Sequence, residues 1–320
     1  MHESPTAECW VLHDGAAGNR RQALALAQSL GLASREWALH ARAPSRWFAP
    51  RQGPFAGHAF GSGFADALHH APPLLAIGCG RIAGLATRLC RRAGSTSVQI
   101  LDPRVSPAHW DLVIAPEHDR LQGDNVINLV GSLNPVDGDW LQSARLDFPA
   151  IASLARPRIA LLIGGPTRAV PLQANDIRQL CQWLARTLER AGGSVIACGS
   201  RRTPPAWAQM LRERFPAPAH LAWMDSEDGR NPYAAALGWA DRIVVTADSV
   251  NMVSEACSTT TPVRVAGLDA STGRIRWFLQ SLLARGRIQP VDEAEWAAEC
   301  IPLQETPRIA SLVRERLRLG

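Results

Sequence analysis

Residues 241–256 read Asp-Arg-Ile-Val-Val-Thr-Ala-Asp-Ser-Val-Asn-Met-Val-Ser-Glu-Ala, and residues 262–267 read Pro-Val-Arg-Val-Ala-Gly. The first segment contains a β-branched run of the kind found in buried strands. Asp248 and Ser249 are residue types that begin helices, and Met252 lies on an apolar helical face. The pattern therefore predicts a strand, a tight turn, a helix and a second strand, which is the repeating unit of a parallel α/β sheet.

The turn before this helix is the first candidate for a binding site. In parallel sheets, ligands bind where the strands end, and the free N–H groups of a following helix attract anions. Glu255 lies two turns beyond Ser249, where its carboxylate could accept a hydrogen bond from a sugar hydroxyl beside a bound phosphate. We predict a nucleotide-sugar site that includes Asp248, Ser249, Met252 and Glu255. The alternative is that Ser249 only caps the helix and that Glu255 is a solvated charge.

The composition limits the possible functions. A chain of 320 residues predicts two domains, and 46% hydrophobic with 20% charged residues is typical of a soluble globular protein. All 34 basic residues are arginine, which excludes a Walker-type lysine and Schiff-base chemistry. The net charge of +5 suits phosphorylated ligands or an anionic membrane surface, and it is too dispersed to predict nucleic-acid binding.

The sequence also indicates the cellular location of the protein and the redox state of its cysteines. No apolar run approaches the roughly 18–20 residues of a membrane span, and the first residues lack the features of a signal peptide. We expect a cytoplasmic protein, with peripheral attachment to the inner face of the membrane as an open alternative. The seven cysteines include no Cys-x-x-Cys pair, so we expect reduced core residues, and no metal site or cofactor is predicted.

The first predicted strand, residues 9–13, ends at a turn that reads Asp-Gly-Ala-Ala-Gly-Asn. Two glycines at a strand-to-helix turn let the backbone approach a ligand closely. Asp14 would stand at the strand tip, where it is the best-placed general base; a role as turn or cap residue is the alternative. The expected acceptor or phosphate loop consists of Gly15, Gly18, Asn19 and Gln22, joined by Asp102 and Arg104 from the end of a later strand.

A second glycine-rich turn, with Gly78, Gly80 and Gly84, follows a strand and opens a helix. Together with Asp102 after the next strand, it matches the fingerprint of dinucleotide-binding domains. An NAD(P)-dependent oxidoreductase or epimerase acting on nucleotide sugars is therefore kept as an alternative. Against it, an earlier strand precedes the motif, and close packing of strand and helix explains these glycines without a cofactor.

Three further segments of the first half contain patterns that bear on the site or on the fold. His118 and Asp119 follow another strand and could form an acid/base pair, with an ordinary surface position as the alternative. The D-x-D pattern at Asp137 and Asp139 lies in a Pro/Gly turn and is assigned to turn chemistry and not to a metal. Residues 42–63, rich in Pro, Gly and aromatics, predict a long loop with little regular structure.

A proline-bounded stretch near residue 150 separates two repeats of the pattern, so we predict domains at 1–152 and 153–320. The tail, residues 309–319, predicts a basic amphipathic helix that packs on the first domain or touches a membrane. Each predicted domain opens with a glycine-tipped strand. The fold predicted from this repetition is two Rossmann-like parallel-sheet domains facing a cleft.

The second domain contains two more candidate loops. Its first strand ends at Gly164 and Gly165, and its second strand ends at Ser200, Arg201 and Arg202. Forked guanidinium groups match the oxygens of a diphosphate, which makes this loop a candidate for nucleotide binding. Paired surface arginines are the alternative.

The chain resembles known families in residues that span almost its whole length. The second half resembles MurG-type glycosyltransferases of the GT-B architecture from Asp241 to Pro262. More specifically, the chain is similar to the mitochondrial-fission ELM (elongated mitochondria) family, whose bacterial members are classed as glycosyltransferases. The matching segments are residues 14–22, 99–104, 111–119, 200–204, 231–233 and 245–256.

The resemblance implies that Glu255 binds the ribose of a UDP-linked donor, as the helix glutamate does in MurG-type enzymes. One departure concerns residues 259–262, which read Thr-Thr-Thr-Pro where related sequences have Thr-Gly-Lys-Pro. Loss of a glycine at the helix end is expected to cost some local stability and to alter the loop near the nucleotide. A plant role in recruiting a dynamin-related protein is not carried over, because no docking segment is visible.

Taken together, these patterns lead us to expect a metal-independent glycosyltransferase that uses a nucleotide-diphosphate sugar and a cell-envelope or lipid-linked acceptor at the membrane surface. Asp14 is the expected base, with His118, oriented by Asp119, as second choice. A non-catalytic binding or scaffold protein is the alternative from a different class. No nucleic acid is expected as a partner.

Overall fold

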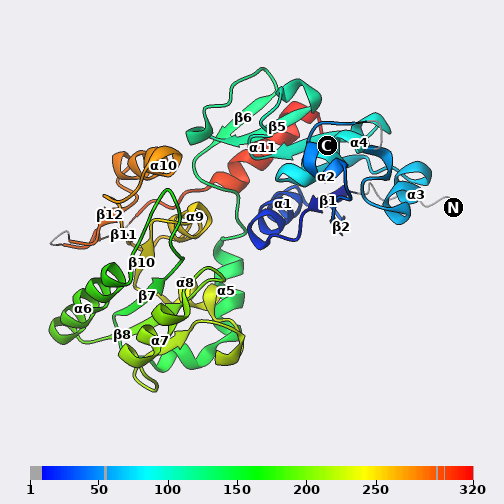
Figure 1. Cartoon of the computed structure of the whole chain (residues 1–320). Coiled ribbons are helices and arrows are strands. Elements are labelled where there is room, and N and C mark those ends of the chain that lie inside the picture. The colour runs from blue at the N-terminus through cyan, green and yellow to red at the C-terminus, as the bar shows by residue number, and fades with distance from the viewer. Residues whose placement is uncertain (1–8, 54–55, 293–294, 299, 320) are drawn as a thin grey trace. The chain divides into compact units, whose positions relative to one another are not determined.

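The computed structural model describes residues 9–53, 56–292, 295–298 and 300–319. The chain forms two compact units, unit 1 with Met1–Pro135 and Gln304–Gly320, and unit 2 with Val136–Leu303 (Figure 1). Each unit contains one six-stranded sheet in which every paired strand is parallel. The prediction of two Rossmann-like parallel-sheet domains is confirmed.

In unit 1 the first strand lies between the second and the third. The sheet order is β2 (Ser34–Ala38), β1 (Cys9–His13), β3 (Leu75–Cys79), β4 (Thr96–Ile100), β5 (Leu112–Pro116) and β6 (Val126–Leu129). Because strand order reverses between β1 and β3, a topological switch point lies at their carboxyl ends, where open α/β sheets bind ligands. The turns after His13 and Cys79 therefore lie at the expected ligand-binding edge of unit 1.

Helices cover both faces of this sheet. They are α1 (Ala17–Ser29), α2 (Ser45–Phe48), α3 (Ser62–His70), α4 (Arg81–Arg92) and α11 (Glu305–Leu317), with 3-10 turns at Ala56–His58, Pro107–His109 and Glu117–Asp119. Neighbouring residues of β1 point to opposite faces. Val11 joins a core with α1 and α11, whereas Trp10 joins a second core with Phe64 of α3 and Leu85 of α4.

The structure corrects one expectation for unit 1 and confirms another. Residues 42–63 are not one irregular loop, because they contain α2, a 3-10 turn and the start of α3. The tail helix α11 packs on unit 1, which is the first of the two alternatives predicted for it: its apolar residues Ile309, Ala310 and Val313 are buried in the core beside α1 and are not available to a membrane. Among the described residues, no helix combines the length and apolar character needed to cross a bilayer.

In unit 2 the sheet order is β12 (Gln289–Pro290), β11 (Val263–Ala266), β10 (Arg242–Thr246), β7 (Arg158–Leu162), β8 (Ser194–Cys198) and β9 (Leu221–Trp223). The strand, turn, helix and strand predicted from residues 241–267 are present as β10, α9 (Val250–Cys257) and β11. The switch point lies between β7 and β10. The turn that begins at Gly164 and the turn that begins at Asp248 therefore both lie at this switch point.

The remaining helices of unit 2 are α5 (Gly138–Asp147), α6 (Ala174–Ala191), α7 (Pro205–Arg214), α8 (Tyr233–Trp239) and α10 (Gly273–Ala284), with 3-10 turns at Pro149–Ser153 and Ser226–Asp228. The division of the chain falls at Pro135 and Val136, before the boundary expected at residues 152 and 153. The reason is α5, which packs on α8: Arg145 Nε donates to the carbonyl of Gly238 at 2.6 Å. Asp137 caps α5 by accepting the Trp140 N–H at 2.7 Å, which is the turn chemistry assigned to the D-x-D pattern.

Six of the seven cysteines are buried, and Cys300 is half-buried. Burial raises the pKa of Cys90, Cys198 and Cys257 to about 12. At neutral pH these thiols are protonated and unreactive. The buried cysteines are core residues, as predicted.

Candidate functional site

The carboxyl ends of β7, β8 and β10 in unit 2 are tied together by one buried carboxylate. The side chain of Asp248 is 0% exposed, and its Oδ2 accepts the N–H of Gly165 at 3.1 Å and Arg202 Nη2 at 2.6 Å. A Cβ on Gly164 would lie 2.0 Å from the same oxygen, so only glycine fits there. Asp248 therefore holds the three strand ends in place, a role that differs from the helix cap expected for it.

Thr203 fixes the loop after β8. Its Oγ1 lies 2.9 Å from the carbonyl of Ile163, 2.8 Å from that of Gly164, and 2.8 Å from the N–H of Ser200, from which it accepts. A Cβ on Gly165 would lie 2.0 Å from the carbonyl of Arg202, so the loops after β7 and β8 are in direct contact. The loop is therefore held by hydrogen bonds and backbone contacts of the protein itself, without a ligand.

The two arginines of this loop differ. Arg201 is exposed, whereas Arg202 is paired with Asp248 and keeps 45% of its side chain exposed. Both arginines lie at the surface, as the alternative has it, but Arg202 also forms an ion pair with the buried Asp248. The exposed part of its guanidinium still has N–H groups available to an anion, because arginine carries five donors and Asp248 takes one of them.

Helix α9 begins beside these loops. Ser249 is its N-cap, and the hydroxyl accepts the Met252 N–H at 3.4 Å. Ser249, Val250 and Asn251 are half-buried, so the first turn is accessible, whereas Met252 is 9% exposed. A half-open helix start next to two arginines is an arrangement that attracts phosphate.

Glu255 is not a solvated charge. It is 2% exposed, and it accepts a short hydrogen bond from the hydroxyl of Tyr233 on α8. Tyr233 lies in residues 231–233, one of the segments that carry the family resemblance, but no sequence pattern indicates a role for it. Only the fold places it against a residue 22 positions later.

The end of α9 is stabilised by a residue that no sequence pattern indicated. Arg287 is 3% exposed and donates to the carbonyls of Cys257 at 2.9 Å and Thr259 at 2.6 Å. Thr259 Oγ1 also donates to the carbonyl of Ala256 at 2.8 Å. The helix end thus has the hydrogen bonds that a glycine cap would have provided, and the loss of stability expected at Thr259 to Pro262 is offset.

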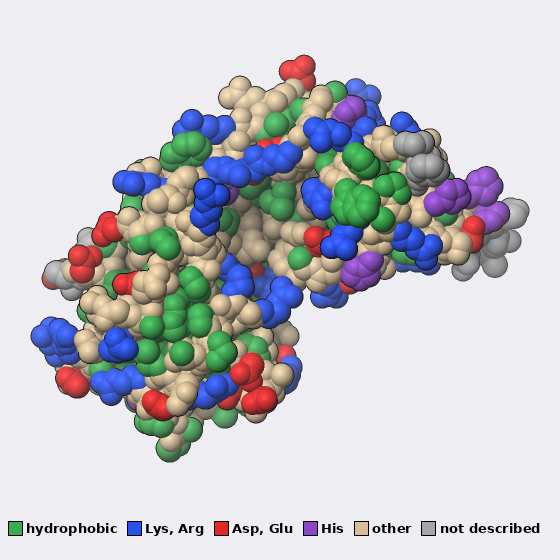
Figure 2. Space-filling view, viewed as in Figure 1, with side chains coloured by type: hydrophobic (Ala, Val, Ile, Leu, Met, Phe, Trp, Pro, Cys, Tyr) green, Lys and Arg blue, Asp and Glu red, His purple; other side chains and the backbone are tan. Residues whose placement is uncertain are grey.

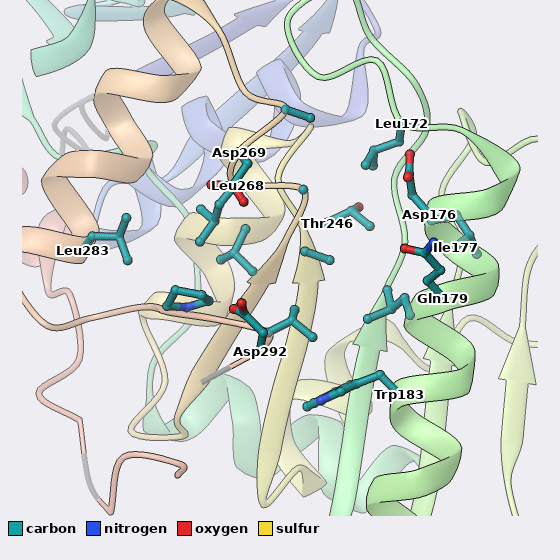
Figure 3. Close-up of a pocket in the computed structure, with 17 residues that line it drawn as sticks. Leu172, Asp176, Ile177, Gln179, Trp183, Thr246, Leu268, Asp269, Leu283 and Asp292 are labelled. Atoms are coloured by element: carbon teal, nitrogen blue, oxygen red, sulfur yellow. The ribbon is translucent and has the colours of Figure 1, made fainter. Parts of the chain in front are cut away.

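A pocket of about 550 Å³ opens on unit 2 at the carboxyl ends of β10 and β11 and runs beside α6 (Figure 3). Apolar residues form most of its wall, with Trp183 at one end and Thr246 at the end of β10. Three carboxylates line it, from Asp176, Asp269 and Asp292, and none of the described lining residues is Arg or His. A diphosphate would be repelled here, whereas hydroxyl groups and the apolar face of a sugar would be accepted.

In unit 1 the tip of β1 is fixed by side chains around Asp14. The Asp14 carboxylate is half-buried and accepts the N–H of Ala16 at 3.1 Å and the side-chain amide of Asn19 at 3.0 Å. Gly15 has φ +82°, a conformation that favours glycine. Its N–H donates to Nδ1 of His13 at 3.0 Å, so that nitrogen carries no proton, and Nε2–H of His13 faces Glu36 at 3.0 Å.

The glycines of the dinucleotide fingerprint are occupied by protein atoms. A Cβ on Gly78 would lie 2.5 Å from Thr87 of α4, and one on Gly80 would lie 2.5 Å from the amide of Asn19. Gly84 packs against Pro50 in the same way, at 3.2 Å. Close packing accounts for this motif, as the sequence argument suggested.

The other residues of the expected acceptor loop are separated. Gly18 lies in the first turn of α1 and is half-buried. Gln22, one turn further, is 4% exposed, and its Oε1 has no hydrogen-bond partner among the described residues. Asp102 follows β4, which is two strands from β1, so roughly 10 Å of sheet separates it from Asp14.

A second polar cluster lies after β4 and β5. Arg104 contacts Asp102 at 3.0 Å and Asp119 at 3.6 Å. Burial lowers the pKa of His118 to about 4 and raises the pKa of Asp119, which Arg104 opposes. Backbone in the left-handed region at Leu101 (φ 74°), Arg104 and Arg120 accompanies this cluster, and such strain is typical of functional loops.

The chain is similar in sequence to the proteins of one known family. Residues 17–317 match the family described as Mitochondrial fission ELM1. The chain is 32% identical over 276 residues to Mitochondrial fission protein ELM1 of Arabidopsis thaliana, and the match covers 77% of this chain. It spans 64% of the length of that relative.

Two solved structures have a similar fold. One is UDP-GlcNAc 2-epimerase from Methanocaldococcus jannaschii, with a TM-score of 0.57 at 11% identity. The match covers 96% of this chain and 99% of the epimerase chain. The other is a glycosyltransferase from Rickettsia africae ESF-5, with a TM-score of 0.51 at 9% identity. The match covers 99% of this chain and 100% of the glycosyltransferase chain. At these identities the likeness concerns the fold alone.

Proposed function

The chain belongs to the Mitochondrial fission ELM1 family and has a GT-B fold, and from this premise we propose that it is a metal-independent glycosyltransferase. Its donor is a nucleotide-diphosphate sugar, with uridine as the base, and its acceptor is lipid-linked or belongs to the cell envelope. The observation that carries the proposal is the half-open start of α9 at the switch point of unit 2, with Arg201 and Arg202 beside it.

The diphosphate binds at the N-terminus of α9. N–H groups of the first turn and the exposed guanidinium groups of Arg201 and Arg202 surround it with positive charge. These groups also stabilise the diphosphate as it leaves, which is the work that a metal ion does in other glycosyltransferases. Glu255, oriented by Tyr233, accepts from a ribose hydroxyl in this proposal.

The sugar enters the pocket beside α6. Its hydroxyl groups donate to the carboxylates of Asp269 and Asp292, and its apolar face lies against Trp183. The separation of charge supports this arrangement, because the arginines lie at the loop after β8 whereas the charged residues lining the pocket are acidic.

The chemical step transfers the sugar in one displacement. The acceptor oxygen attacks the anomeric carbon, the bond between that carbon and the diphosphate oxygen breaks, and the bonding electrons leave with the nucleotide. Asp14 takes the proton of the acceptor hydroxyl. The donors from Ala16 and Asn19 hold its carboxylate in one orientation and leave it half-exposed to an acceptor.

A binding or scaffold role without turnover is the second candidate, which the name of the ELM1 relative favours. The internal partners of Arg202 and Glu255 also favour it, because both side chains stabilise the fold without a ligand. A family fold can be kept after its chemistry is lost.

Thermal unfolding with nucleotides tests the proposal. UDP and UDP-sugars are expected to raise the unfolding temperature of the whole chain, and NAD(H) is not. Arg201→Ala is expected to weaken the shift, whereas Arg186→Ala, which removes an exposed arginine from α6, is the matched control. Stabilisation by NAD(H) but not by UDP would overturn the proposal. Binding of UDP without acceptor-dependent release from any UDP-sugar would favour the scaffold role.

A further inference from the structure

Helix α2 of unit 1 exposes two adjacent aromatic side chains. Trp47 is 72% exposed and Phe48 is 56% exposed. For comparison, the exposed Trp277 of unit 2 is 42% exposed. Scattered apolar residues on a surface are ordinary, but two consecutive aromatic residues that are both more than half exposed leave apolar area in water within one turn.

The exposure is not the result of a loose segment. Arg81 Nη1 donates to the carbonyls of Arg46 and Ala49, both at 2.9 Å, and Arg88 Nη1 donates to the carbonyl of Pro50 at 2.7 Å. These two arginines belong to α4, and Ala49 and Pro50 are buried against the unit. The backbone of α2 and of the two residues after it is thus held by α4, and its two aromatic side chains are exposed.

The surroundings of α2 are basic. The sequence from residue 37 to residue 65 contains no Asp or Glu, and Arg42, Arg46 and Arg51 are all exposed. Among the described residues, none of these three arginines is paired with a carboxylate. Figure 2 shows hydrophobic side chains over this part of unit 1 with arginines around them.

We propose that α2 docks this protein on an anionic lipid bilayer. Trp47 and Phe48 insert at the level of the headgroups, where amphipathic and aromatic rings are favoured. Arg42, Arg46 and Arg51 face the anionic headgroups. We call these five residues the α2 patch.

A bilayer fits this patch better than a protein or nucleic acid. A stable protein interface buries about 800 Å² on each partner with many complementary contacts, whereas here two rings stand out from a short turn. A ring of charges around a small apolar tip is the pattern of peripheral membrane attachment, which is reversible and sensitive to salt. The inference does not depend on the proposed transfer reaction, because its test measures binding to vesicles and not turnover.

Flotation of the whole chain with vesicles tests the inference. Vesicles of phosphatidylcholine with about 30% phosphatidylglycerol are expected to bind the protein at low salt, and vesicles of phosphatidylcholine alone to bind it at least about tenfold more weakly. The double variant Trp47→Ala/Phe48→Ala is expected to lose about tenfold or more in vesicle affinity. Arg46→Ala/Arg51→Ala is expected to lose the dependence on phosphatidylglycerol. Trp277→Ala, which removes an exposed tryptophan from unit 2, is the matched control and is expected to bind normally.

A conservative variant shows whether the ring itself enters the bilayer. Brominated lipids are expected to quench part of the tryptophan fluorescence, and Trp47→Phe is expected to lose that part while still binding vesicles. Equal binding of the double alanine variant and the original chain would overturn the inference. So would a failure of the original chain to bind anionic vesicles at low salt, in which case a protein partner becomes the better occupant.

Discussion

Arg202 Nη2 lies 2.6 Å from Oδ2 of Asp248, and the two residues join the ends of β8 and β10 in unit 2. Asp248 is fully buried, and its second oxygen, Oδ1, has no hydrogen-bond partner among the described residues. A buried carboxylate with so few donors depends on its cation. The same arginine can therefore serve the fold and present its exposed N–H groups to a diphosphate.

Arg202→Ala is expected to destabilise the chain by about 1–3 kcal/mol, because Asp248 would keep only the N–H of Gly165 while buried. Urea unfolding measures the loss as a shift of the midpoint. Arg201→Ala removes the exposed neighbour and is expected to change stability by less than about 0.5 kcal/mol. Equal effects of the two substitutions would show that the pair is not structural.

Tyr233→Phe tests the contact between α8 and Glu255. The substitution removes the hydroxyl that donates to a carboxylate 2% exposed, so stability is expected to fall by about 1–3 kcal/mol. If Glu255 also binds ribose, the affinity for UDP falls about tenfold, since the carboxylate is no longer oriented. Calorimetry with UDP checks this, and an unchanged affinity would remove Tyr233 from the binding site.

Asp14→Asn is expected to remove most of the transfer rate and to leave UDP affinity nearly unchanged. The asparagine oxygen can still accept from Ala16 and Asn19, but the side chain cannot take a proton. Glu255→Ala is expected to do the reverse and chiefly weaken nucleotide binding. Full activity of Asp14→Asn would refute the role of this residue, and His118 would be the next base to test.

The pH dependence of stability is expected to contain a contribution from His118. Burial lowers its pKa to about 4 from the ordinary 6.5, so the folded chain keeps a neutral imidazole where the unfolded chain is protonated. Between these two values the unfolded state binds more protons, so stability rises with pH across the window and falls as the pH drops towards 4. We expect a contribution of roughly 1–2 kcal/mol after screening by solvent.

His118→Gln should flatten this part of the curve, and the measurement is a series of urea midpoints between pH 4 and pH 7. His69→Gln changes a histidine on exposed α3 and is the control. An identical slope in both variants would mean that His118 is as accessible to protons in the folded chain as in the unfolded one.

The parts of the fold that depend on local pattern could be predicted. The run from Ile243 to Val245 and the cap at Ser249 are enough to define β10 and the start of α9, because both signals lie within a few residues. The role of Asp248 could not be predicted, since its partners Gly165 and Arg202 lie 83 and 46 positions away. Nothing in the sequence shows whether an aspartate at that position caps the helix or is a buried carboxylate that links strand ends.

The structure differs from the sequence-based prediction where distant residues stabilise a segment. Helix α2 lies in a stretch whose Pro and Gly content predicts a loop, but Arg81 and Arg88 of α4 donate to carbonyls of α2 and of the two residues that follow it. Similarly, the proline-rich stretch after α5 predicts a domain boundary there, which would put α5 in the first domain, whereas its contact with Gly238 places it in unit 2. Composition marks turns, but packing decides which unit a helix joins.

The sequence does not predict the pocket beside α6, because its wall comes from segments between Leu172 and Asp292 that no motif connects.

The acidic lining of this pocket predicts that Asp269 contributes to the binding of the sugar and not to the binding of the nucleotide. Asp269→Ala is expected to weaken a UDP-sugar about five- to tenfold and to leave free UDP unaffected, since the carboxylate contacts only the sugar. Glu189→Ala, an exposed carboxylate near the other end of α6, is the control. Calorimetry with both ligands separates the cases: if Asp269→Ala weakens UDP and UDP-sugar equally, the pocket holds the nucleotide and not the sugar, and if it strengthens UDP, the aspartate lies close enough to repel the diphosphate.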